Sequence, residues 1–243
     1  MEHPTLLANK RVVVIGGSSG IGFEVAKQAG ALGANLVVVS SQKDRVQQAV
    51  TVLGGKAEGY TLNVLDELLV SRFFEQLGSF DHLVYTAGDT LHLTELANAD
   101  IAQAKRAFDL RYWGMIAAVK HASGHINKGG SIVLTTGAAG RRPNKGWVFS
   151  ASVCGTIEAV TLALAVELAP LRVNAVCPGV VRTDLWKNMS DDARSQLYQS
   201  VGDRLLVGRV GEADEIALAY LFLMQEGFST GQTVVVDGGT MLV

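Results

Sequence analysis

Short runs of β-branched residues alternate with segments of helical period along the whole chain, and this alternation constrains the fold more than any other feature. The helical segments lie near residues 20–32, 42–53, 66–77, 98–125, 147–168 and 212–226. The strand-like runs lie near 11–15, 35–39, 57–62, 81–86, 130–135, 171–177 and 233–236. Strict alternation implies right-handed crossovers between parallel strands. We therefore expect an α/β fold: a doubly wound, seven-stranded parallel sheet with helices on both faces.

The size and charge of the chain narrow its class. Its 243 residues suit one domain spanning 1–243, large enough to bury roughly 70–75% of the unfolded surface. A net charge of −2 gives no electrostatic footprint for nucleic acid or an anionic membrane, so we expect a small-molecule substrate as the partner. The start of the chain lacks the features of a signal peptide, and the two cysteines form no CxxC pair. These features favour a cytoplasmic protein.

A glycine-rich loop follows the first predicted strand. It reads Gly16-Gly17-Ser18-Ser19-Gly20-Ile21-Gly22 and leads directly into a helical segment. Glycines at such positions allow a tight turn and close approach of a pyrophosphate. The helix start then offers unpaired N–H groups and the positive end of its dipole to the phosphates. The loop therefore predicts a phosphate-binding site.

The spacing GxxxGIG resembles the short-chain dehydrogenase/reductase (SDR) superfamily, whose fold is Rossmann-like. Three further segments resemble family motifs: Leu62-Asn63-Val64, Tyr85-Thr86-Ala87-Gly88, and Pro178-Gly179-Val180-Val181-Arg182-Thr183. The resemblance implies a nicotinamide dinucleotide cofactor. The residues that it implies for cofactor binding are Gly16, Ser18, Ser19, Gly20, Ile21, Gly22, Asn63, Val64, Ala87, Gly88, Pro178, Gly179, Val181 and Thr183.

The end of the second predicted strand bears on which nicotinamide cofactor binds. NAD-binding sites place a carboxylate there, which would repel the 2′-phosphate of NADP. This chain has Ser40 and Ser41 instead, followed by Lys43 and Arg45. Hydroxyl and cationic donors suit a phosphate. We therefore expect NADP(H) rather than NAD(H), with Ser40, Ser41 and Lys43 as binding residues.

The catalytic positions depart from the family pattern. Family members usually carry an Asn-Ser-Tyr-Lys tetrad, in which the tyrosine donates a proton. At the corresponding positions this chain has Arg111, Gly137, Phe149 and Val153. Phenylalanine has no proton to give and valine has no charge. No tyrosine occurs between Tyr112 and Tyr198, so a shifted alignment restores nothing.

Two functions remain open. The first is an NADP(H)-dependent oxidoreductase that reduces an activated C=C bond or a conjugated carbonyl, where a donor need only stabilise charge on oxygen. Its candidate catalytic residues are Arg111, Thr136 and Tyr112, with Arg141 or Arg142 as further candidates. The second is a catalytically silent NADP(H)-binding sensor or structural subunit.

Three other features carry expectations. Segment 184–210 occupies the place of the family's substrate lid. The nearly all-round apolar character of 147–168, together with 98–125, favours a homodimer or homotetramer through these helices. His121 and His125 have the i, i+4 spacing of metal ligands but no third ligand, so we expect no metal site. A nucleophilic role for Cys154 is less favoured than packing.

Overall fold

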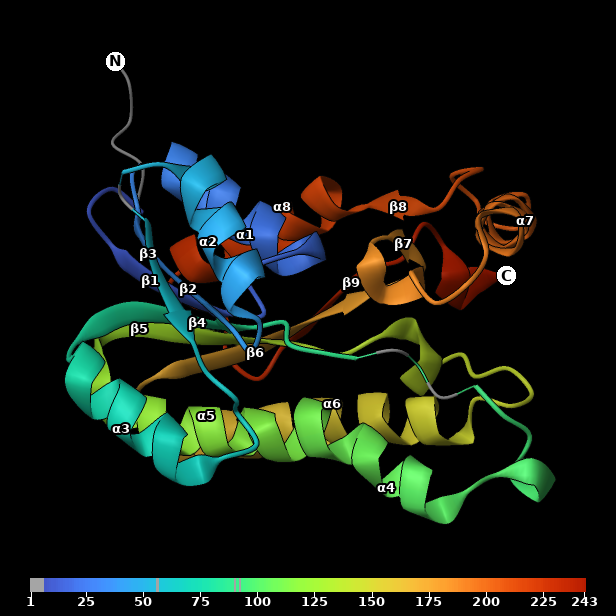
Figure 1. Cartoon of the computed structure of the whole chain (residues 1–243), viewed down its shortest axis with the longest axis horizontal. Coiled ribbons are helices and arrows are strands. Elements are labelled where there is room, and N and C mark those ends of the chain that lie inside the picture. Colours follow the sequence, from blue (N-terminus) through green and yellow to red (C-terminus); the bar gives the residue numbers. More distant parts are fainter. Residues whose placement is uncertain (1–6, 56, 90, 92) are drawn as a thin grey trace.

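The sheet is built from seven parallel strands, as the alternating pattern predicts. The computed structural model describes residues 7–55, 57–89, 91 and 93–243. The strands of the sheet are β1 (Arg11–Ile15), β2 (Asn35–Ser40), β3 (Ala57–Thr61), β4 (Phe80–Tyr85), β5 (Ile126–Thr135), β6 (Arg172–Pro178) and β9 (Thr233–Val236). Their order is β3-β2-β1-β4-β5-β6-β9, and all neighbouring pairs are parallel (Figure 1). The order reverses between β1 and β4, where ligands of such sheets bind.

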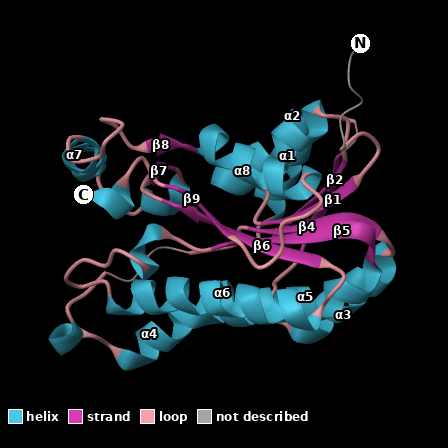
Figure 2. Ribbon diagram, turned by 180° about the vertical axis from the view of Figure 1, so that it is seen from behind, coloured by secondary structure: helices cyan, strands magenta, loops and turns pink. Residues whose placement is uncertain are grey.

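Helices cover both faces of the sheet, as Figures 1 and 2 show. One face carries α1 (Gly20–Ala31), α2 (Lys43–Leu53) and α8 (Ala213–Gln225). The other face carries α3 (Glu67–Leu77), α4 (Ile101–Phe108), α5 (Gly114–Ala122) and α6 (Val148–Glu167). A sheet sandwiched in this way has strands that are buried on both sides.

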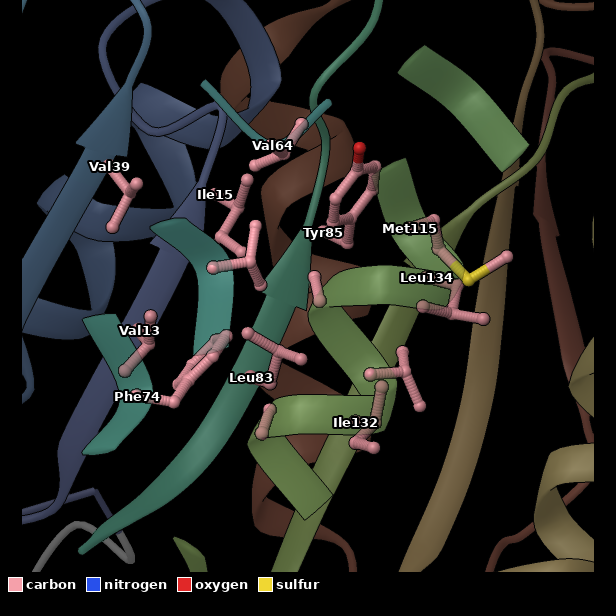
Figure 3. Packing of buried hydrophobic residues seen from close by; sticks show 14 of the residues in the cluster. Val13, Ile15, Val39, Val64, Phe74, Leu83, Tyr85, Met115, Ile132 and Leu134 are labelled. Atoms are coloured by element: carbon pink, nitrogen blue, oxygen red, sulfur yellow. The ribbon is translucent and has the colours of Figure 1, made fainter. Parts of the chain in front are cut away.

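Each strand contributes alternate side chains to two separate cores. Val12 and Val14 pack with the helices α1 and α8, while Val13 and Ile15 pack with the opposite layer. This follows from the two-residue period of a strand. The core that contains Val13 and Ile15 also includes Phe74, Leu83, Met115 and Ile132 (Figure 3).

The predicted helix over 98–125 is a continuous helical run from residue 101 to residue 125, but its hydrogen-bond pattern changes along its length. The structure has 3₁₀ turns at Leu96–Asn98 and Ser123–His125, the helices α4 and α5, and a π-helical segment at Asp109–Trp113 between them. Asp100 begins α4, because its side chain accepts hydrogen bonds from the backbone N–H groups of Ala102 and Gln103. The π segment has its own polar support: the Tyr85 hydroxyl donates to the Leu110 carbonyl at 2.5 Å.

Segment 184–210 contains a helix that the sequence pattern did not predict, α7 (Asp191–Gly202). A 3₁₀ turn at Asp184–Trp186 precedes it, and two short strands, β7 (Val181–Arg182) and β8 (Gly211–Glu212), pair in parallel at its base. Trp186, Tyr198 and Val210 form a small buried cluster inside this unit. It lies at the end of the sheet where β9 ends (Figure 1).

One helix in the described part of the chain, α6, is long and apolar enough to span a membrane by length and composition. Its core-facing side is formed by Val153, Ile157, Thr161 and Ala165, which are buried. The spacing of four residues keeps these side chains on one stripe of the helix.

Candidate active site

A cavity of about 990 Å³ lies at the carboxyl ends of the strands. Its walls follow the order of the sheet: Ser40 and Ser41 after β2, Gly16 after β1, Ala87 after β4, Thr136 after β5, Gly179 after β6 and Thr240 after β9. Neighbouring strands are about 4.8 Å apart, so the cavity extends across five strand spacings. Pockets for small molecules and cofactors reach about 1,000 Å³, and this one lies at the top of that range.

The glycine-rich loop closes tightly against β4. Gly16 has φ +87°, and a Cβ there would lie 2.6 Å from the backbone nitrogen of Ala87. A Cβ at Gly22 would overlap the Gly16 carbonyl oxygen and the Thr86 hydroxyl. Any larger residue at these two positions would therefore push the loop away from the strand ends, where a bound phosphate group needs close backbone approach.

The start of α1 fits the pyrophosphate of a dinucleotide. Ser19 occupies the N-cap position but makes no side-chain capping hydrogen bond. The first N–H groups of α1 consequently remain available, together with the positive end of the helix dipole. Ser18 and Ser19 both line the cavity. Thr183 faces the loop from the other wall, 3.4 Å from the position of a Cβ on Gly20.

The adenosine end differs from the prediction at one residue. Ser40, Ser41 and Arg45 line the cavity, but Lys43 does not. Lys43 is the first residue of α2, and two residues along a helix turn a side chain by about 200°. Arg45 therefore faces the cavity while Lys43 faces solvent, and Arg45 forms an ion pair with Asp184 at 3.4 Å.

All the other predicted cofactor-binding residues line the same cavity. They come from four separate segments of the chain: Gly16, Ser18, Ser19, Gly20, Ile21, Gly22, Asn63, Val64, Ala87, Gly88, Pro178, Gly179, Val181 and Thr183. The structure thus brings the glycine-rich loop and the Pro-Gly segment together, as a dinucleotide lying across the strand ends requires.

Arg111 lies in the π segment and lines the cavity. Its guanidinium lies beside Gly88, within 2.8 Å of the position that a Cβ would take there. Its Nε is 3.6 Å from the Asp89 carboxylate, and its Nη2 donates to the Asp89 backbone carbonyl. No hydrogen bond within the described residues occupies Nη1, so this nitrogen can donate to a ligand.

Thr136 also lines the cavity, but its hydroxyl proton is already used. It donates to the backbone carbonyl of Cys154 at 2.9 Å. Thr136 can therefore accept a hydrogen bond, but it can donate to a ligand only by giving up this one. Gly137 packs closely against Cys154, since a Cβ at this glycine would lie only 3.2 Å from Cys154 Sγ. Burial raises the pKa of the Cys154 thiol, which keeps it protonated at neutral pH and disfavours a nucleophilic thiolate.

Three sequence-predicted positions lie outside the cavity. Val153 is a core residue with 2% exposure, and Phe149 does not line the cavity. Tyr112 packs edge-on against Trp113, with ring centroids 4.7 Å apart, and does not line the cavity either. Among the residues that the structure describes, no tyrosine forms part of the cavity wall.

Sequence reasoning missed several residues of the site. Tyr85 lies outside the cavity wall but supports the site, because its hydroxyl donates to the Leu110 carbonyl in the segment that carries Arg111. Arg204, Thr240 and Val243 also line the cavity, and no local sequence pattern predicts that they do.

The histidine pair has no metal-site geometry around it. His121 Nε2 lies 3.1 Å from the Glu67 carboxylate, which also contacts Lys120. Within the described ranges, no group of three His, Cys, Asp or Glu side chains is placed to hold a metal ion.

Comparison with known proteins gives a consistent relationship. A family model described as enoyl-(acyl carrier protein) reductase matches residues 15–241. The short-chain dehydrogenase/reductase ATR9 of Stachybotrys chlorohalonatus is 35% identical, over 98% of this chain and 99% of that protein.

Solved structures agree with these matches. A small-chain dehydrogenase in complex with NADPH is 40% identical, with a TM-score of 0.86 over 97% of this chain and 100% of that one. The MalC reductase/Diels-Alderase of Malbranchea aurantiaca is 27% identical, with a TM-score of 0.91 over 99% of both chains. These matches show that the chain belongs to the short-chain dehydrogenase/reductase superfamily of oxidoreductases.

Proposed function

We propose that the protein is an NADP(H)-dependent oxidoreductase that reduces an activated C=C bond or a conjugated carbonyl compound without a tyrosine proton donor. One observation carries this proposal. Arg111 lines the cavity with a free guanidinium nitrogen, while no tyrosine of the described chain reaches the cavity wall.

The residues around the cavity fit the cofactor. The start of α1 would hold the pyrophosphate, and Arg45 with Ser40 and Ser41 would hold the 2′-phosphate. The Pro178–Thr183 segment would face the nicotinamide. When bound, the reduced cofactor supplies a hydride to the substrate.

Arg111 can stabilise negative charge but cannot readily supply a proton, since the pKa of a guanidinium exceeds about 12. In a conjugated substrate the hydride adds to the β-carbon, and the electron pair of the C=C bond moves to the carbonyl oxygen. Arg111 Nη1 would donate a hydrogen bond to this enolate oxygen. A water molecule then protonates the α-carbon. A plain ketone would give an alkoxide that needs an acid at once, and Thr136 has no free proton.

A silent NADP(H)-binding sensor or subunit is the second candidate. The observation that favours it is the apolar character of the positions where the family places its acid and lysine, Phe149 and Val153. The presence of Pro178, Gly179 and Thr183 in the cavity wall favours an enzyme, because a protein that binds only the adenosine half of the cofactor would not need a nicotinamide-binding segment.

The exposed side of α6 supports the homo-oligomer that the apolar pattern predicts. Exposed residues recur there at intervals of four and three: Val148, Ser152, Gly155, Ala159, Leu162 and Val166. This spacing forms one continuous stripe, with small residues at its centre and apolar residues at its ends. Small residues allow a second helix to approach closely. The same stripe accounts for the membrane-like composition of α6 without a membrane.

Segment 184–210 serves as a substrate lid in this proposal. It contributes Leu185, Val201 and Leu205 to the cavity wall, and its own buried cluster allows it to move as a unit.

The test combines binding and turnover. Purified protein is titrated with NADPH and NADH and then assayed on enones, saturated ketones and alcohols. We expect tighter binding of NADPH and turnover of enones. Arg111→Ala should lower kcat by about 10²- to 10³-fold while the NADPH dissociation constant changes little. Full activity of this variant, or good reduction of plain ketones but not enones, would contradict the mechanism. Tight NADPH binding with no turnover of any compound would establish the sensor instead.

A further inference from the structure

The cavity carries more positive charge than the chain as a whole. Five cationic side chains line it: Arg45, Arg111, Arg142, Lys187 and Arg204. The lining acids are Asp89 and Asp184, and these already pair with Arg111 and Arg45. This excess of cationic over acidic side chains in the cavity wall contrasts with the net charge of −2 of the whole chain. Within the described residues, no Asp or Glu side chain forms an ion pair with Arg142, Lys187 or Arg204.

Two of these cations lie away from the phosphates of the cofactor. The phosphate-binding residues follow β1 and β2, whereas Arg142 follows β5, and β5 lies three places from β2 in the sheet. Arg142 Nη2 donates to the main-chain oxygen of Val243, beyond β9. Lys187 comes three residues after Asp184, on the segment that reaches Arg45, so we assign Lys187 to the cofactor side.

Arg204 lies at the same end as Arg142. It follows α7, and the next residues pack on the turn after β9: the backbone nitrogen of Val207 donates to the Gly238 carbonyl at 3.3 Å. Figures 1 and 2 show α7 beside the C-terminal turn. Arg204 Nε donates to the Ser200 carbonyl at 3.1 Å, and its two terminal nitrogens make no hydrogen bond within the described chain.

The cavity wall also contains apolar side chains, beside the polar Asn144 and Thr240. The apolar ones are Leu91, Leu110, Trp147, Val201 and Leu205. A polar or highly charged body would be poorly solvated against these side chains. A molecule that fills this end should therefore be apolar along most of its length and carry its charge at one end.

We infer that the substrate is an apolar molecule with a terminal carboxylate, which Arg204 and Arg142 bind while Arg111 faces the reacting carbonyl group. The inference rests on the proposed function for the identity of the site. Arginine favours carboxylates, since its planar fork of N–H donors matches the two carboxylate oxygens. An uncharged compound of the same shape would offer these two guanidinium groups no negative charge to pair with.

Binding calorimetry on the protein loaded with oxidised NADP⁺, which has no hydride to transfer, tests this inference without any turnover. The probes are trans-cinnamate and cinnamamide, which share one apolar body and differ in charge. We expect cinnamate to bind about 10-fold more tightly than the amide. Arg204→Gln should remove most of this preference and leave amide binding unchanged. Arg194→Gln is the matched control, because Arg194 lies on α7 outside the cavity and pairs with Asp191.

Equal affinities for the two probes, no measurable binding of cinnamate, or equal losses for both probes in Arg204→Gln would overturn the inference. Arg142→Gln provides a second variant, for which a selective loss of cinnamate is again expected. Failure of the proposed function gives a different pattern. In that case Arg111→Ala retains turnover, or no enone reacts, whatever the preference between the two probes.

Discussion

The Nη1 atom of Arg45 lies 3.4 Å from Oδ2 of Asp184, so an ion pair connects the first turn of α2 with the segment that begins the proposed lid. Both residues line the cavity, and their side chains are 34% and 57% exposed. A 2′-phosphate at Ser40 and Ser41 would compete with Asp184 for the same guanidinium. Asp184 therefore opposes the binding that Arg45 favours.

Substitutions at this pair should separate the two nicotinamide cofactors. Arg45→Ala should weaken NADPH about 10-fold and leave NADH nearly unchanged, because the lost contact is charge-assisted. Asp184→Asn should tighten NADPH by about 2- to 5-fold, since an exposed pair contributes little. Fluorescence titration measures both constants. Lys43→Ala is the control, as its side chain faces away from the cavity. A larger NADPH loss in Lys43→Ala than in Arg45→Ala would reject this assignment.

Gly22→Ala should abolish cofactor binding and lower the melting temperature. The added methyl group would overlap the Gly16 carbonyl and the Thr86 hydroxyl, both fixed by the ends of β1 and β4. Strain of this kind in a packed region typically costs about 1–3 kcal/mol. Gly124→Ala is a matched control, since nothing lies within 4 Å of a Cβ there. Differential scanning calorimetry and NADPH titration report the two effects, and normal NADPH affinity in Gly22→Ala would argue against the close-approach role.

Ala159→Lys should lower the mass of the homo-oligomer that we propose. Ala159 lies at the centre of the exposed stripe of α6, where a second helix is expected to approach, and a lysine there would hold the helices apart. Sedimentation velocity of the wild type and the variant measures the change. Gln48→Lys adds the same charge on the exposed side of α2 and should not alter the mass. A wild type that is monomeric at micromolar concentration would contradict the proposal.

Stability should fall below neutral pH because of His82. The ring is buried, and Nδ1 lies 2.9 Å from the Ser131 hydroxyl. Burial is the largest cause that lowers the pKa of His82; Asp81 opposes it, Arg172 and Lys10 add to it, and the resulting pKa is about 4. The unfolded chain, with an ordinary pKa of about 6.5, binds the proton first. The stabilisation is complete above that pH and is lost as the pH falls from about 6.5 to about 4, by at most about 3 kcal/mol.

Urea unfolding at several pH values measures this dependence. His82→Asn keeps a polar atom near the position of Nδ1 but cannot be protonated, so its stability should change less with pH over this range. His125→Asn, at a partly exposed position, is the control. An unchanged pH profile in His82→Asn would show that other groups control acid stability.

The sequence predicts the sheet well because its signals are local. Val12–Ile15 and Val37–Val39 are continuous apolar runs, and runs of this kind are typical of strands that are covered on both faces. The helix at 191–202 left no such signal. It buries only Tyr198 and Gly202, and Tyr198 packs with Trp186, which lies outside the helix in the sequence. The π-helical segment at 109–113 is supported by Tyr85, which is 25 residues away from Leu110 in the sequence.

In the site, too, local features can be predicted from the sequence, whereas features that depend on distant contacts cannot. The glycine-rich loop is predictable, since one short segment contains the turn, the phosphate donors and the helix start. The choice between Lys43 and Arg45 is not, because both are cations near one turn and only the orientation of α2 distinguishes them. Arg204 reaches the cavity through the packing of α7 on the turn after β9, a relationship that no sequence window contains.

The π segment makes the length of the chain between Asp109 and Trp113 a determinant of the site. A π turn holds one more residue than an α turn, and each residue rotates a helix by about 100°. Deleting one residue here would let α4 and α5 merge into a regular helix. Arg111 would then swing away from Gly88, and the Tyr85 hydroxyl would lose its acceptor. A relative that keeps an arginine here but lacks the extra residue would present a different surface to its ligand. An insertion or deletion in this segment can therefore change which side chains face the cavity without substituting any of them.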